Sequence, residues 1–225
     1  MRIKKSVEAS WKQKSLYKNL FLFCFLVILS FAFQGITQKL ILTKTIVSEY
    51  LQNQMSYDSV LKALEIGEKW AWVNYILIPV IYLIKFALIS LWFLCGAILF
   101  GFKTNFTSIF KAVLEAEFVW LVPPLLLIVW FGLIDTSYTF NEVQYFAPLS
   151  LLSLFDASQL DNWLIYPLKS LNLFEVSYLL ALALGIKNIM KKDYDSALKF
   201  TLPVYGSALV VWILFVTFLS INLGA

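Results

Sequence analysis

The sequence lacks histidine altogether and has only two cysteines, Cys24 and Cys95, among its 225 residues. The lack of histidine excludes histidine-based metal sites and imidazole acid–base catalysis. Both cysteines lie within apolar runs and form no CxxC motif, so we expect them to be small apolar residues rather than a redox centre. No nucleotide-binding loop, dinucleotide fingerprint, GxSxG or HExxH motif occurs either. We therefore predict a protein that is not an enzyme and has no metal or cofactor.

Charge is also scarce, since charged residues make up 14% of the chain and hydrophobic residues 60%. A soluble domain has roughly a quarter of its residues charged, which covers its surface. Several uncharged runs approach or exceed the roughly 20 residues that a membrane helix needs. We therefore predict an integral membrane protein of the all-α class, a polytopic bundle of five transmembrane helices.

The uncharged runs divide the chain into a basic leader, residues 1–18, and a single membrane domain, residues 19–225. The spans are predicted at about 19–38, 71–102, 118–134, 167–189 and 200–222. The second run exceeds the membrane thickness, so it must tilt, kink near Pro79 or extend beyond the bilayer. In the third run, Pro123 and Pro124 predict a kink.

The lysines and arginine give the orientation, because cytoplasmic loops are enriched in basic residues. With five spans, twelve of the 18 basic residues fall on one side, in the leader and in the loops after the second and fourth spans. This distribution predicts a cytoplasmic N-terminus, an outer C-terminus and location in the inner membrane. One alternative is that the first run is a cleaved signal peptide, since "SFA" at 30–32 resembles a cleavage site. A mature N-terminus near Phe33 would leave four spans.

The two outer loops, 39–70 and 135–166, differ in character. The first contains "YDSVLKALEIGEK", with apolar residues at helical spacing, and predicts a short amphipathic helix or hairpin on the outer surface. The second is acidic, and its apolar stretch "VQYFAPLSLLSLF" is too short to span. We expect an interfacial or re-entrant segment there.

Two ionisable residues, Lys85 and Glu175, fall within predicted spans, where charge is costly and usually faces protein or water. Both helices run from outside to inside, and both residues lie roughly 8 to 12 Å below the outer interface at 1.5 Å per residue. The favoured prediction is a Lys85–Glu175 ion pair that fixes helix register. The alternatives are a lined cavity that binds an ion, proton or polar substrate, and side chains that extend to the interface.

Glu115 and Glu117 are predicted at the inner end of the third span. Lys111 and Glu115 are spaced i,i+4, which predicts an ion pair at the interface. Two carboxylates two residues apart on a helix point to different faces, which argues against a catalytic pair.

Small residues recur at intervals of four in the fourth predicted span, at Ser177, Ala181 and Gly185. Such a stripe lets another helix approach closely. Glu175 lies about a third of a turn from this stripe at 100° per residue. The fourth span is therefore predicted to need protein neighbours on two sides.

The stretch "LKSLNLFEVSYLLALALGIKNIMKKDYDSALKF", followed by a final apolar span, resembles the bacterial type of the Yip-domain family, the Ypt-interacting-protein-like membrane proteins. The likeness covers residues 70–222 and rests on these positions: Leu171, Asn172, Phe174, Gly185, Lys187 and Lys191. The acidic leader with Tyr, Gly and Pro that eukaryotic members carry is absent. The first outer loop is also longer than the compact loop expected of the family. The resemblance implies five spans with the N-terminus inside and a non-enzymatic membrane scaffold, in some relatives an accessory subunit of ATP-driven exporters of the macrolide-efflux type.

Three functions follow as hypotheses. The favoured one is a scaffold or accessory subunit that binds the lipid bilayer and other integral membrane proteins, an ABC-type exporter among them, or a second copy of itself, with no nucleic acid. The runner-up is a small transporter or channel subunit in which Lys85 and Glu175 line a polar path. A lipid-handling membrane enzyme is disfavoured, because the chain lacks histidine and clustered cytoplasmic carboxylates.

Overall fold

A computed structural model describes the backbone of residues 2–223 and the side chains of residues 17–222. Over this part of the chain the structure is helical, without strands, and the predicted all-α class is confirmed. Five of the described helical segments are long and apolar enough to cross a membrane: Tyr17–Ile41, Tyr57–Leu99, Phe106–Ile134, Leu173–Met190 and Tyr194–Asn222. The side chains of the basic leader lie outside the described residues, apart from those of Tyr17 and Lys18.

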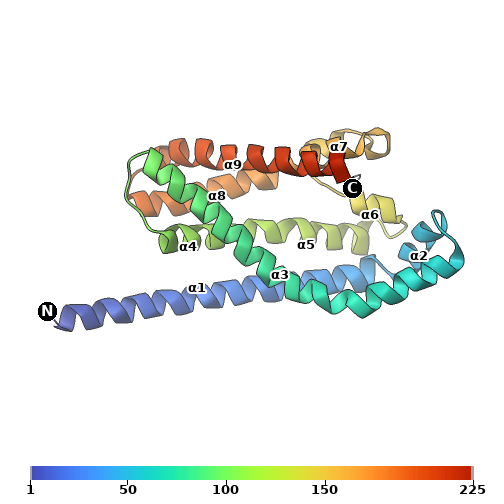
Figure 1. Ribbon diagram of the computed structural model, residues 1–225, viewed down its shortest axis with the longest axis horizontal. Helices are drawn as coiled ribbons and strands as arrows, with labels where there is room; N and C mark the ends of the chain where they lie inside the picture. The colour runs from blue at the N-terminus through green and yellow to red at the C-terminus, as the bar shows by residue number, and fades with distance from the viewer. Residues whose placement is uncertain (1, 224–225) are drawn as a thin grey trace.

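The first half of the chain contains two very long helices. The elements in order are α1 (Arg2–Ile36), the π-helical turn η1 (Thr37–Ile41), α2 (Lys44–Gln52) and α3 (Tyr57–Leu99). The backbone of the leader is continuous with the first span in α1, and α3 contains the whole second predicted span. Pro79 lies inside α3, which continues through it and bends midway along its length (Figure 1).

The third span is assembled from four shorter pieces. They are α4 (Phe106–Ala116), the 3-10 turn η2 (Glu117–Leu121), α5 (Val122–Val129) and the π-helical turn η3 (Trp130–Ile134). Pro123 and Pro124 lie in the first turn of α5, where a missing N–H costs little. The irregularity associated with the two prolines therefore lies just before them, in η2.

The second half contains a short-helix region and two spanning helices. Its elements are α6 (Phe140–Tyr145), η4 (Leu151–Leu154), η5 (Ala157–Gln159), α7 (Asn162–Ser170), α8 (Leu173–Met190) and α9 (Tyr194–Leu223). The fourth predicted span, 167–189, is corrected here, since residues up to Ser170 belong to α7 and the spanning helix begins only at Leu173. Asn172 ends the interruption by accepting a hydrogen bond from the backbone of Glu175 at 2.7 Å, as an N-cap does.

Helices α1, α5, α8 and α9 lie roughly side by side, whereas the second half of α3 crosses obliquely, and the start of α1 and the end of α9 lie at opposite ends of the bundle (Figure 1). The turns between α3 and α4 and between α8 and α9 lie at the N-terminal end, whereas α2, α6 and α7 gather at the other end. The predicted outer loop 39–70 is a helical hairpin of α2 and the start of α3, joined by the Lys44–Glu68 ion pair. The loop 135–166 contains short helices and turns.

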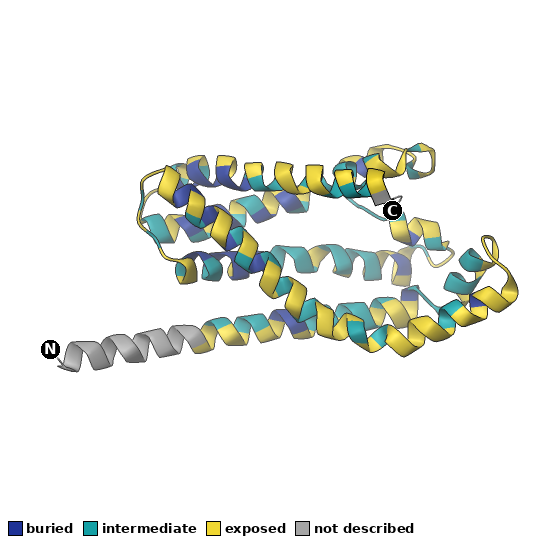
Figure 2. Cartoon of the chain, in the orientation of Figure 1, coloured by how far each residue is buried: buried dark blue, intermediate teal, exposed yellow. Residues whose placement is uncertain are grey.

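Buried residues concentrate where α3, α4, α8 and α9 meet, and the hairpin of α2 and α3 is largely exposed (Figure 2). The largest fully buried side chains there include Phe86, Phe93, Tyr178 and Leu182. Lipid tails are as apolar as these side chains, so close packing rather than exclusion of water must hold the helices together. Gly96 of α3 supplies one close approach, because a Cβ built on it would lie 2.6 Å from a methyl group of Val204 in α9.

Candidate functional site in the membrane interior

Lys85 and Glu117 form an ion pair inside the bundle, with 2.6 Å between Lys85 Nζ and Glu117 Oε1. Lys85 comes from α3, and Glu117 is the first residue of η2 in the third span. The Glu117 side chain is 2% exposed and that of Lys85 36% exposed. The carboxylate is thus buried in the protein, while the ammonium group is partly exposed at the margin of the cluster.

This pairing corrects the prediction that Lys85 pairs with Glu175. The third span was expected to start at Phe118, which placed Glu117 at the membrane edge, but helical structure begins at Phe106. Helices α3 and α4 are antiparallel and joined by a short turn, and both charges lie roughly three to four helical turns from it. Similar distance from the connecting turn was the sequence signal that would have identified the pair. Lys85 remains close enough to Glu175 for its charge to act on that carboxylate.

Glu175 is instead bound by Tyr205, whose hydroxyl group donates a hydrogen bond to Glu175 Oε1. Glu175 lies in the first turn of α8 and Tyr205 in the middle part of α9. Glu175 is 9% exposed, and its side chain enters the bundle between these two helices. The bond thus links the start of α8 to α9.

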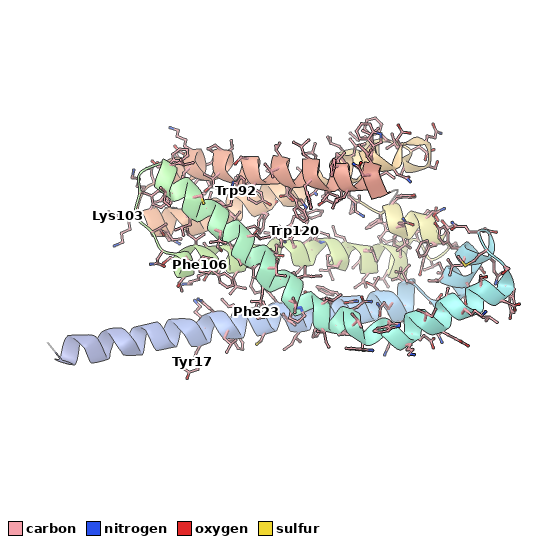
Figure 3. The ribbon with its side chains drawn as sticks, in the orientation of Figure 1. Tyr17, Phe23, Trp92, Lys103, Phe106 and Trp120 are labelled. Carbon is pink, nitrogen blue, oxygen red and sulfur yellow. The ribbon has the colours of Figure 1, made fainter. Side chains whose placement is uncertain are left out.

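Aromatic rings fill the space between the two acids. Lys85 Nζ lies 5.4 Å from the ring centroid of Trp120 and 5.6 Å from that of Tyr178, distances at which a cation is attracted to a ring face. Tyr178 in turn contacts the ring of Tyr205, with centroids 5.4 Å apart. Trp120, labelled in Figure 3, lies near the start of α5 in the middle of the bundle. We call this set the polar cluster; its members are Lys85, Glu117, Trp120, Glu175, Tyr178 and Tyr205.

Three polar atoms of the polar cluster are buried without a hydrogen-bond partner. They are Glu117 Oε2, Trp120 Nε1 and the hydroxyl oxygen of Tyr178. Tyr178 is completely buried, and its hydroxyl group is within electrostatic range of both Glu117 and Glu175. Buried polar groups normally find a partner, because an unsatisfied one costs about 1–3 kcal/mol. The cluster therefore retains binding capacity that the protein itself does not use.

The charges of the polar cluster do not balance when all are ionised, because two carboxylates face one ammonium group. Burying an uncompensated ion costs several kcal/mol even after the protein relaxes. The hydrogen bond from Tyr205 and the N-terminus of α8 both favour an ionised Glu175, but a helix terminus contributes at most about 2 kcal/mol. Burial of an ionised Glu175 therefore costs more free energy than the N-terminus of α8 returns by stabilising the ion.

The stripe of Ser177, Ala181 and Gly185 lies on α8, and its residues have different surroundings. A Cβ built on Gly185 would lie 2.6 Å from the Cβ of Ala112, so this end of the stripe is packed against α4 of the same chain. Ser177 is exposed, and its hydroxyl group donates to the carbonyl oxygen of Leu173 at 2.8 Å. Ala181 is half-buried between them.

A separate hollow of about 370 Å³ lies at the other end of α8, beyond Gly185. Its polar lining comes from the α3–α4 turn, α4 and the end of α8, and includes Lys103, Lys111, Glu115 and Lys191. Lys111 and Glu115 form the predicted i,i+4 ion pair there, at 3.7 Å. This hollow does not include any member of the polar cluster.

The chain matches no family model, no curated protein and no solved structure. Its function must therefore be inferred from the arrangement of its own residues.

Proposed function

We propose that this chain is a non-enzymatic scaffold or accessory subunit of the inner membrane that binds other integral membrane proteins, with its N-terminus in the cytoplasm. The observation that supports the proposal is that four contacts between polar side chains of the described residues each join two of the spans. They are Ser30–Tyr82 between α1 and α3, Lys85–Glu117 between α3 and η2, Trp92–Ser207 between α3 and α9, and Tyr205–Glu175 between α9 and α8.

Contacts of this kind fix the positions of helices. A hydrogen bond between membrane helices contributes about 0.6 kcal/mol on average, and a few together determine register. A bundle whose helices are joined by such contacts presents a fixed outer surface to its neighbours in the bilayer. Such a surface suits a subunit that binds a partner without transforming a substrate.

The partner surface that we propose is the exposed face of α8 around Ser177. Leu173, Val176 and Leu180 surround Ser177 on this face, and each of them is more than two-fifths exposed. A small residue among large apolar ones allows another membrane helix to approach at that point. The Gly185 end of the stripe is already covered by α4, which leaves the Ser177 end for a partner chain.

We further propose that the chain is a member of the Yip-domain family and acts as an accessory subunit of ATP-driven exporters. The proposal rests on the sequence resemblance, and two of the residues that carry it have defined structural roles. Asn172 caps α8, and Lys191 ends the same helix in a left-handed conformation with a φ of 54°. ATP hydrolysis would have to come from the partner chains.

Affinity purification in a mild detergent tests the proposal, with Ser177→Leu as the variant that blocks the exposed stripe. We expect the wild-type chain to co-purify reproducibly with one or more integral membrane proteins, and Ser177→Leu to lose them while remaining folded. Gly35→Leu is the matched control, because a side chain there enters open space on a different helix. A wild-type chain that purifies alone and carries ion or solute flux in liposomes would contradict the proposal.

The second candidate is a small transporter or channel subunit in which Lys85 and Glu175 line a polar path. The unpartnered Glu117 Oε2 and Tyr178 hydroxyl favour this candidate, because they are groups that a moving ion or proton would use. In liposomes it predicts a flux that Glu175→Gln abolishes.

A further inference from the structure

We propose that the polar cluster is a proton-binding site, and that near neutral pH it holds one exchangeable proton on the carboxyl group of Glu175. The inference concerns the charge state of the bundle and does not depend on which partner the protein binds. It is carried by the geometry of the cluster, in which two carboxylates share one ammonium group.

The ion pair determines which of the two acids is ionised. Lys85 Nζ lies 2.6 Å from Glu117 Oε1, so its charge compensates Glu117 directly. Glu175 has no such contact, and its partner is the neutral hydroxyl group of Tyr205. One proton on Glu175 makes the cluster neutral, and a neutral cluster is the form that a low-dielectric interior favours.

The titratable and charged groups that face Glu175 come from each helix packed around it. They are Lys85 of α3, Glu117 of η2, Tyr178 of α8 and Tyr205 of α9. Lys85 is the only cation in this set, and its ion pair with Glu117 is already formed. Lys169, on α7 just before α8, donates to the carbonyl oxygen of Gln144, and Lys111 and Glu115 pair with each other near the opposite end of α8.

An independent observation also indicates a ligand in the cluster. The hydroxyl group of Tyr178 is completely buried, lacks a partner and lies within electrostatic range of both carboxylates. A hydroxyl group both donates and accepts, so it can serve either acid when the proton moves. Glu117 Oε2 is a second unpartnered atom in the same place.

A proton fits the site better than a divalent metal ion does. Within the described part of the chain, no three acidic, cysteine or histidine side chains converge to hold a metal ion. Glu175 is in the first turn of α8 and is 9% exposed, so its carboxyl group is not fully enclosed and can exchange a proton. The exchange converts a carboxylate and a proton from water into a carboxylic acid, with no other reactant.

Infrared spectroscopy of the purified chain in detergent, recorded in H₂O and D₂O, tests the site by the carbonyl band of a protonated carboxylic acid. We expect this band near neutral pH in the wild type, its loss in Glu175→Gln, and its retention in the control Glu115→Gln, which removes an exposed carboxylate. Tyr205→Phe should keep the band and shift its frequency, because the acid loses its hydrogen-bond donor.

Lys85→Met gives a second readout that does not require replacement of either acid. Without its cation the cluster should take up a second proton, and the band area should increase about two-fold. The proposal is overturned if the folded wild type lacks the band, or if Glu175→Gln retains it unchanged. It is also overturned if sodium chloride stabilises the protein against heat where choline chloride at the same pH does not, since a sodium ion would then occupy the site.

Discussion

Gly185 of α8 lies so close to Ala112 of α4 that a Cβ built on the glycine would stand 2.6 Å from the alanine Cβ and 3.2 Å from its Cα. The second distance matters more, because it is to backbone that cannot rotate away. The two helices approach at this point only because one of them has no side chain there. The contact lies beside the hollow at the end of α8 opposite Glu175.

The first prediction follows from this contact. Gly185→Ala should destabilise the protein by about 1–3 kcal/mol, as expected for overpacking of a well-packed site. Adding Ala112→Gly should recover part of that loss, because it removes the atom that the new Cβ meets first. Unfolding in detergent, followed by circular dichroism, measures both. Gly35→Ala is the control, since its new Cβ meets nothing within 4 Å. Equal stability of the Gly185→Ala and Gly35→Ala variants would show that the contact is absent.

The capping box at the start of α6 leads to a prediction about pH. The backbone N–H of Thr139 donates to Glu142 Oε2 at 2.6 Å, and the Glu142 backbone N–H donates to the Thr139 hydroxyl oxygen. The backbone and hydroxyl hydrogen bonds from Thr139 lower the pKa of Glu142 below its usual value. The lowered pKa means that this stabilisation is complete above the ordinary glutamate value and is lost as pH falls through the folded-state value.

Hydrogen exchange of the α6 amides should therefore be slowest near neutral pH, relative to the intrinsic rate, and should lose protection as the solution becomes acidic. Glu142→Gln should remove the pH dependence and leave less protection throughout. Asp135→Asn, upstream of the box, serves as the control. A Glu142→Gln variant with the same acid dependence as the wild type would refute this account.

Orientation gives a third prediction. The structure places Gln54, in the turn between α2 and α3, and Lys103, in the turn between α3 and α4, at opposite ends of the bundle. In a background where Cys24 and Cys95 are replaced by alanine, a membrane-impermeant thiol reagent should label Gln54→Cys from outside intact cells. Lys103→Cys should react only after the membrane is opened. The reverse pattern would invert the topology that we propose.

Much of the fold was accessible from the sequence, because membrane spans depend on hydrophobic length alone. The all-α class and the five spans follow from the uncharged runs. The residues at which helices begin and end were harder to predict. For example, α7 and α8 are separated at Leu171–Asn172 although the apolar pattern continues through them. The capping hydrogen bond of Asn172 and the backbone bonds of Leu171 and Leu173 to Leu151 and Leu149 mark the break, and hydrophobicity reports neither signal.

The site was predicted in part. Lys85 and Glu175 were identified as ionisable residues inside the spans, and both lie in the polar cluster. Glu117 was assigned to the membrane edge because its neighbours Lys111 and Glu115 are charged, and α4 extends the span beyond them. Tyr178 and Tyr205 gave no signal, since tyrosine in a membrane segment usually marks an interface. Which side chains share a level in the bundle depends on helix packing, which the sequence of one helix does not contain.

The central claim is that Lys85 and Glu117 fasten α3 to the third span, and a double-mutant cycle on their unfolding free energies tests it most directly. Lys85→Met alone should cost about 3–5 kcal/mol, because Glu117 loses its cation and must take up a proton to stay buried, and this cost should shrink as pH falls. The double variant Lys85→Met/Glu117→Gln should be closer to the wild type than Lys85→Met is, because a glutamine needs neither a cation nor an added proton to be buried. Purely additive effects of the two substitutions would contradict the account.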